Sequence, residues 1–195
     1  MKKFIHGTLD LVLIVLGIFS AGLGLKGALA IAREEVGPGL DMLRSALETL
    51  SVKKLNILLT LFSGALAEGL RLTRRLEEAL LTVNGAIARA TDCGSTYDMP
   101  ELLRIKAQIL AAMPRHGRES AISCLTEAIE VARVQSALAL ELRSMMTLVR
   151  LLSEGGQRDQ ALHELALVHH RFTEGFQTKD LKQARALLED MRPQL

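Results

Sequence analysis

Apolar residues recur along this chain at the spacing of one face of an α-helix. Between Ala121 and Ala132 they stand at i, i+1, i+4, i+7, i+8 and i+11, which places them on a single stripe of a helix. Similar stripes begin at Leu76 and Ala161. The four prolines stand at breaks between such segments or near the end of the sequence, where proline is tolerated. The pattern therefore predicts an all-α protein without β-strands.

One apolar trio, small-x-x-x-large-x-x-small, occurs four times. Its first members are spaced by 40, 42 and 40 residues, which indicates an internal repeat. The copies are Gly39, Leu43 and Ala46; Ala79, Val83 and Ala86; Ala121, Leu125 and Ala128; and Ala161, Leu165 and Val168. An apolar helical pattern precedes each trio, so each repeat is expected to be a helical hairpin with the trio on its second helix.

We predict an α-solenoid in which the hairpins stack and bury their apolar faces against one another. The first helices are expected at about 9–32, 54–72, 100–113 and 138–153. The hairpins are expected at about 9–50, 54–90, 100–135 and 138–172, followed by a final helix at about 179–191, in one array over residues 1–195. The breaks are expected at Gly37-Pro38-Gly39, at Thr73, at 114–117 and at Gly155-Gly156.

The trio resembles the second-helix pattern of tetratricopeptide repeats. In that family a small residue of each first helix lets two backbones approach, and Gly27, Ala67, Ala107 and Val149 stand at that place here. The period is near 40 residues, where the family has 34, and its aromatic positions hold other residues. The resemblance implies a non-catalytic protein-interaction scaffold.

A narrower resemblance covers nearly the whole chain. The segments 64–69, 100–106 and 171–176 are similar to the helical repeat tails of bacterial multidomain signalling ATPases of the nucleotide-cyclase or winged-helix regulator type. The chain has no Walker A sequence, so the resemblance implies such a tail without its N-terminal domains. The expected partner is a protein or acidic peptide, with a signalling ATPase domain as one candidate.

Composition excludes some classes of partner. The 24 basic and 22 acidic residues are interspersed and give a net charge of +2, so no basic stripe indicates nucleic-acid binding. Cys93 and Cys124 lack metal-motif spacing. They are either free thiols of a reducing compartment or a disulfide, and we favour a cytoplasmic protein.

The N-terminal region contains the parts of a secretory signal. Lys2 and Lys3 precede a charge-free run from Leu11 to Leu25, and Ala28-Leu29-Ala30 has the form of a cleavage site. Asp10 and Lys26 interrupt this arrangement, and the run is shorter than the roughly 20 residues of a membrane span. We favour a buried repeat helix over a membrane partner. The alternative is a membrane-anchored or exported repeat protein that uses residues 1–30 as anchor or signal.

No local motif indicates a catalytic, cofactor or metal site. Gly22, Gly24 and Gly27 form a G-x-G-x-x-G sequence, but no second strand follows it, as a dinucleotide site would require. His169 and His170 are six and seven positions from His163, whereas zinc ligands on one helix stand a turn apart. We therefore expect no cofactor, no metal and no enzymatic activity.

Four arginines are the candidate partner-binding residues. In the tetratricopeptide frame Arg71, Arg104, Arg143 and Arg150 fall near the face that lines the concave groove. Guanidinium groups suit carboxylates and phosphates, so these arginines predict an acidic partner. The alternative is that they are solvated or pair with neighbouring glutamates.

Overall fold

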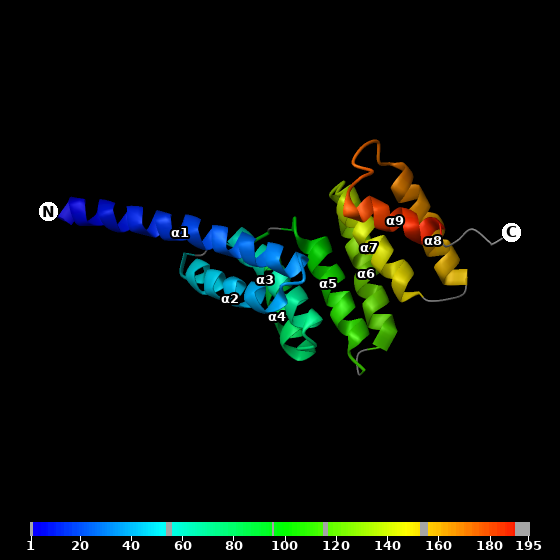
Figure 1. Ribbon diagram of the computed structural model, residues 1–195, viewed down its shortest axis with the longest axis horizontal. Coiled ribbons are helices and arrows are strands. Elements are labelled where there is room, and N and C mark those ends of the chain that lie inside the picture. Colours follow the sequence, from blue (N-terminus) through cyan, green and yellow to red (C-terminus); the bar gives the residue numbers. More distant parts are fainter. Residues whose placement is uncertain (1, 54–55, 95, 115–116, 153–155, 190–195) are drawn as a thin grey trace. The chain divides into compact units, whose positions relative to one another are not determined.

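The structure, a computed structural model, describes residues 2–53, 56–94, 96–114, 117–152 and 156–189 as helices joined by short turns (Figure 1). Within these ranges there are nine helices and no β-strand. They are α1 (Lys2–Ala32), α2 (Val36–Lys53), α3 (Asn56–Leu72), α4 (Leu76–Asp92), α5 (Met99–Ala112), α6 (Gly117–Val134), α7 (Leu138–Leu151), α8 (Gly156–His170) and α9 (Lys179–Glu189). Consecutive helices pack as antiparallel pairs, so the all-α prediction is confirmed.

The predicted hairpins correspond to α1–α2, α3–α4, α5–α6 and α7–α8, and the predicted final helix corresponds to α9. Their predicted ends differ from the observed ones by a few residues, apart from α1, which begins earlier, at Lys2. Parts of the predicted elements and breaks lie outside the described residues, at 54–55, 115–116, 153–155 and 190–191.

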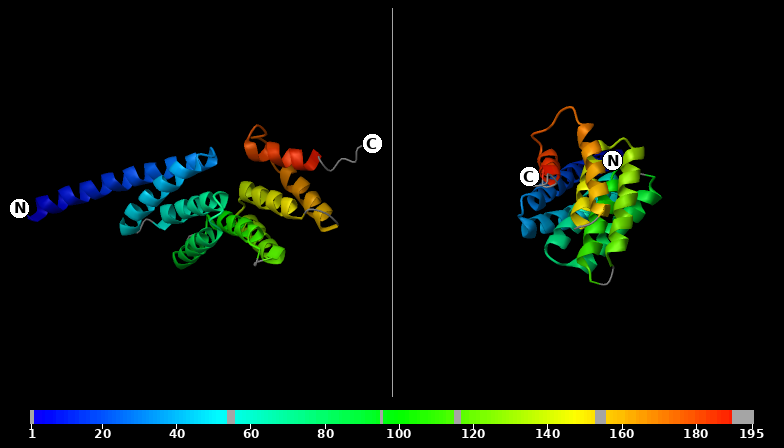
Figure 2. Two further views of the ribbon diagram at one scale, coloured as in Figure 1. Left: turned by 60° about the horizontal axis from the view of Figure 1, so that its bottom comes forward. Right: turned by 90° about the vertical axis from the view of Figure 1, so that its right-hand side faces the viewer.

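The chain divides into two compact units, Met1–Asp98 and Met99–Leu195, here called unit 1 and unit 2. In unit 1, α1 packs along α2 and also contacts α3, while α3 pairs with α4. In unit 2, α7 is the central helix and contacts α5, α6, α8 and α9. Figure 2 shows the helices of each unit from two further sides. A single continuous array over residues 1–195 stays a prediction.

The repeated trio forms the centre of the core in both units. Its four large members, Leu43, Val83, Leu125 and Leu165, are fully buried, and all its small members are buried too. The small residues predicted on the first helices are likewise buried. Because small side chains let two helices approach and the large one fills the space beside them, the repeat specifies one packing seam per hairpin.

The seam between α1 and α2 is a contact between backbones. A Cβ atom added to Gly27 would stand 3.0 Å from the carbonyl oxygen of Gly39, and a Cβ atom on Gly39 would stand 3.0 Å from that of Gly27. One turn earlier, a Cβ atom on Gly24 would overlap the ring of Phe62 on α3. The G-x-G-x-x-G sequence is thus part of a helix, and its last two glycines serve close packing.

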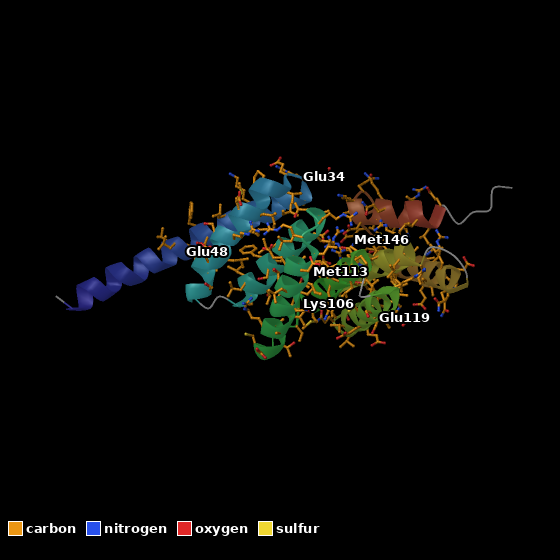
Figure 3. The ribbon with its side chains drawn as sticks, turned by 90° about the horizontal axis from the view of Figure 1, so that it is seen from below. Glu34, Glu48, Lys106, Met113, Glu119 and Met146 are labelled. Atoms are coloured by element: carbon orange, nitrogen blue, oxygen red, sulfur yellow. The ribbon has the colours of Figure 1, made fainter. Side chains whose placement is uncertain are left out.

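The turn of the first hairpin lies earlier than the sequence predicts. Gly37-Pro38-Gly39 is not a break but the first turn of α2, where proline is suited because its missing N–H needs no partner. The turn is formed by residues 33–35, and Glu34, exposed at the end of the hairpin (Figure 3), has a φ of +69°.

Two further turns share this geometry. Arg74 after α3 has a φ of +62°, and Ser136 after α6 has a φ of +56°. In each turn the residue that follows donates its N–H to a carbonyl five positions back, as Arg75 does to Leu70 at 2.9 Å. This is the pattern of a Schellman cap, which usually carries glycine at the left-handed position. The predicted break at Thr73 is confirmed.

Candidate functional site

Each of the four predicted arginines has a partner within its own unit. Arg71 lies on α3 in unit 1 and donates two hydrogen bonds to Glu68, from Nε at 3.0 Å and from Nη2 at 2.8 Å. Arg104 on α5 in unit 2 makes the same two-pronged contact with Glu101, at 2.9 and 2.8 Å. In this geometry two N–H groups of the guanidinium are hydrogen-bonded to both oxygens of the carboxylate, which is a strong form of ion pair.

Arg143 and Arg150 of α7 face the final helix. Arg143 donates from Nε to Asp180 of α9 at 2.6 Å, and its Nη1 lies 4.0 Å from Glu101. Arg150 donates to Gln183 of α9 at 3.3 Å. Arg104 lies near Glu101 and Arg150. The structure therefore places three of the four predicted arginines near one another in unit 2, and two of them, Arg143 and Arg150, contact α9.

The electrostatics of this cluster favour its internal pairing. Burial by itself would raise the pKa of the Glu101 carboxyl, but hydrogen bonding to Arg104 and the charges of Arg104 and Arg143 outweigh burial and lower that pKa. Burial, together with the nearby charge of Arg104, lowers the pKa of Arg150. An acidic ligand would thus compete with Glu101 and Asp180, which belong to the protein itself.

A buried acid that the sequence did not reveal lies at the start of α7. The side chain of Glu141 is 2% exposed and accepts hydrogen bonds from Nε of Arg133 and Nη1 of Arg171, both at 2.7 Å. Arg133 also reaches Glu164 of α8 at 3.2 Å. Hydrogen bonding to Glu141 is the main reason that the pKa of Arg133 is raised. Through these ion pairs the four residues link α6, α7, α8 and the segment after α8.

Beside these ion pairs, unit 2 has a groove of about 950 Å³, here called the α6–α8 groove. Its floor is apolar and includes Ile129, Met145 and Leu152, all buried. Its walls are the facing sides of α6 and α8. The wall residues are Arg118, Glu119, Ile122, Ser123, Thr126, Glu130 and Arg133 on α6, and Gln157, Gln160, Ala161 and Glu164 on α8. The Arg133–Glu164 pair bridges the two walls.

The two cysteines and the histidines of α8 are the described residues whose chemistry could matter outside the arginine cluster. Both cysteines are free, and burial is the main cause that raises the pKa of the Cys124 thiol, which disfavours the nucleophilic thiolate. Burial and the charge of His170 lower the pKa of His169. His163 is exposed. Within the described part of the chain no three His, Cys, Asp or Glu side chains are grouped as metal ligands would be.

One described stretch, Val15–Ala32 of α1, is long and apolar enough to cross a membrane, and a third of it is buried. Over Val15–Ala32 the helix is therefore buried on the side that packs on α2 and α3, as predicted for a repeat helix, and exposed or half-buried elsewhere.

The comparisons with known proteins identify no family. No protein-family model matches the chain, and no curated protein is significantly similar to it.

Proposed function

We propose that the protein is a non-catalytic helical-repeat module, and that it binds an amphipathic helix of a partner protein in the α6–α8 groove. The observation that supports this most is an open groove with an apolar floor between two helices that occupy the same position in successive repeats. Grooves of this kind receive helices through apolar side chains at i, i+3, i+4 and i+7.

The shape of the groove suits a helix. Because α6 and α8 are both antiparallel to α7, they run in the same direction on either side of it. Ile122 and Leu148 line the groove and are only half-buried. A bound helix would remove the remaining apolar surface of these two side chains from water, which is the main source of affinity in such contacts.

The charge of the groove favours a basic ligand. Arg133 is engaged by two carboxylates, Glu141 and Glu164. On the α6 wall, Glu119 and Glu130 are exposed at the rim beside Arg118. The charged residues that line the groove, three glutamates and two arginines, sum to a net charge of −1. We therefore expect lysine or arginine on the flank of the ligand that faces α6. The arginine cluster near α9 is the alternative site, and it would select an acidic ligand.

A peptide-display selection on the full-length protein tests this proposal. We expect enriched peptides to share helical apolar spacing and basic flanks. Glu130→Lys should weaken their binding by roughly tenfold, because it reverses a rim charge. Glu127→Lys is the matched control, since Glu127 is exposed on the same helix and does not line the groove. Acidic peptides that bind both variants equally would refute the groove and favour the arginines.

The resemblance to repeat tails of bacterial signalling ATPases supplies the first partner to test. We infer that an ATPase domain of that class, in the cytoplasm, is the natural source of the bound helix. A purified domain of this kind should displace the selected peptides from the protein. Its binding should be weakened by Glu130→Lys and unchanged by Glu127→Lys. A domain that binds without displacing the peptides would contradict this inference.

A further inference from the structure

The two sides of α1 carry different kinds of apolar residue. The side that packs on α2 and α3 carries small residues, and Gly17, Ser20, Gly24 and Gly27 are buried there. The opposite side carries large apolar side chains that are exposed to solvent, which are Val15, Ile18, Phe19, Leu25 and Leu29. Ile18 and Phe19 are each 69% exposed. We call this second side the outer face of α1.

Of the fourteen exposed large apolar residues of the described chain, α1 carries six, five of them on its outer face, and no other described helix carries more than three. Elsewhere in the described chain Leu81 and Val134 are 76% and 88% exposed, but they stand on different helices, which is ordinary for a protein surface. In the sequence the apolar pattern continues toward the N-terminus, with Leu11 seven positions before Ile18 and Phe4 seven positions before Leu11. At 1.5 Å per residue, the described part of the outer face, from Val15 to Leu29, is about 21 Å long.

The helix α1 also carries a positive charge equal to the net charge of the whole chain. α1 contains three lysines and one aspartate, a net charge of +2. The whole chain, with 24 basic and 22 acidic residues, also has a net charge of +2, so the residues outside α1 are neutral in sum. A cationic helix with a long apolar face is complementary to anionic lipid headgroups above an acyl layer.

We propose that α1 anchors the protein to an anionic lipid bilayer by lying in the interface with its outer face toward the acyl chains. This proposal is independent of the α6–α8 groove. The helix lies in the plane because α2 runs beside it and exposes Asp41 and Glu48, which a membrane-crossing α1 would carry into hydrocarbon. Figure 3 shows Glu48 near the end of α2, where α1 continues past the other helices of unit 1.

The anchor is retained in the folded protein. Cleavage after Ala30 would remove Gly24 and Gly27 from their contacts with Phe62 and Gly39. Phe62 and Leu43 are fully buried in unit 1, and loss of α1 would uncover them. The small-residue side of α1 is part of the core of unit 1. The same helix can therefore pack on unit 1 with this side and contact the membrane with its outer face.

Flotation of the full-length protein with vesicles tests the anchor. The vesicles are phosphatidylcholine containing about one third phosphatidylglycerol. We expect the wild type to float with them and the double variant Ile18→Asp, Phe19→Asp to lose binding by at least about tenfold, since two apolar contacts become charged. The matched control is Leu81→Asp with Val134→Asp, which makes the same change at equally exposed positions of other helices and should float like the wild type.

Circular dichroism serves as the folding control, and both double variants should keep the helical content of the wild type. A wild type that stays at the bottom of the gradient overturns the proposal, and so do two double variants that float equally. A second copy of the chain is the competing occupant of the outer face. If the wild type is a dimer that ignores vesicles, and Ile18→Asp with Phe19→Asp makes it monomeric, the face is a dimer interface and the lipid proposal is wrong.

Discussion

The contact between Gly24 and Phe62 gives a direct measure of how tightly α1 is built into unit 1. Gly24 is buried, and an added Cβ atom would overlap the Phe62 ring, which is itself fully buried. Gly22, two residues earlier on the same helix, is exposed and has no atom within 4 Å of an added Cβ. The substitutions Gly24→Ala and Gly22→Ala are therefore a matched pair.

Both substitutions gain the same helix propensity, about 0.5–1 kcal/mol of stability relative to glycine. Only Gly24→Ala adds the steric conflict, and overpacking of a core costs about 1–3 kcal/mol. We expect Gly22→Ala to be slightly more stable than the wild type and Gly24→Ala to be less stable than Gly22→Ala by about 1–3 kcal/mol. Urea unfolding followed by circular dichroism measures the difference.

Equal free energies of unfolding for the two variants would refute the close packing of α1 on α3. A loss of stability in both variants would instead show that residues 22–24 are not helical in solution, because alanine is favourable only in a helix.

Three further predictions concern other parts of the fold. Ala128→Arg should destabilise the protein by about 2–5 kcal/mol, because Ala128 is fully buried in an apolar seam; a thermal midpoint equal to that of the wild type would contradict the repeat register. Arg74→Gly should stabilise by about 0.5–1 kcal/mol, since Arg74 has a φ of +62°, whereas Arg75→Gly, at a φ of −86°, should not. The pKa of Glu101 is lowered from 4.5, so its carboxylate stabilises the fold above that pH and loses this effect as the pH falls through the folded pKa. Glu101→Gln should therefore cost stability at neutral pH and less in acid, and an equal cost at both would show that the charge is irrelevant.

The features that the sequence predicted correctly are those set by residues close together in the chain. The trio with Ala121, Leu125 and Ala128 spans eight positions, so its helical face can be read directly from its spacing, and the same holds for the other copies. The end of α3 at Thr73 was also predictable, because an apolar pattern stops there. Gly37-Pro38-Gly39 misled the prediction, since these residues suit both a turn and the first turn of a helix.

The features that the sequence could not predict arise when distant segments meet. Glu141 is 8 positions from Arg133 and 30 from Arg171, and no spacing along one helix links them. The pairing of Arg143 depends on Asp180, which is 37 positions away on α9. The tetratricopeptide frame placed Arg104, Arg143 and Arg150 on a common side, but it gave no sign that α9 would contact two of them.

The arginine cluster also changes how the acidic-partner hypothesis can be tested. Arg104→Glu would set a second carboxylate against Glu101, and the Arg104 side chain is only 13% exposed. Like charges in this position destabilise the fold, so lost binding would not report on the ligand. Arg150, which is exposed and contacts Gln183, is the better position: Arg150→Glu should leave basic helical peptides bound in the α6–α8 groove.

Methyl NMR of the full-length protein with a selected helical peptide tests most directly where a partner binds. Ile122 and Ile129 line the groove, whereas Ile105 and Ile109 lie on α5 in the same unit and do not. We predict that the δ1-methyl signals of Ile122 and Ile129 shift on titration and that those of Ile105 and Ile109 do not. Shifts confined to Ile105 and Ile109, or no shift at a peptide concentration that saturates binding, would contradict the proposed function.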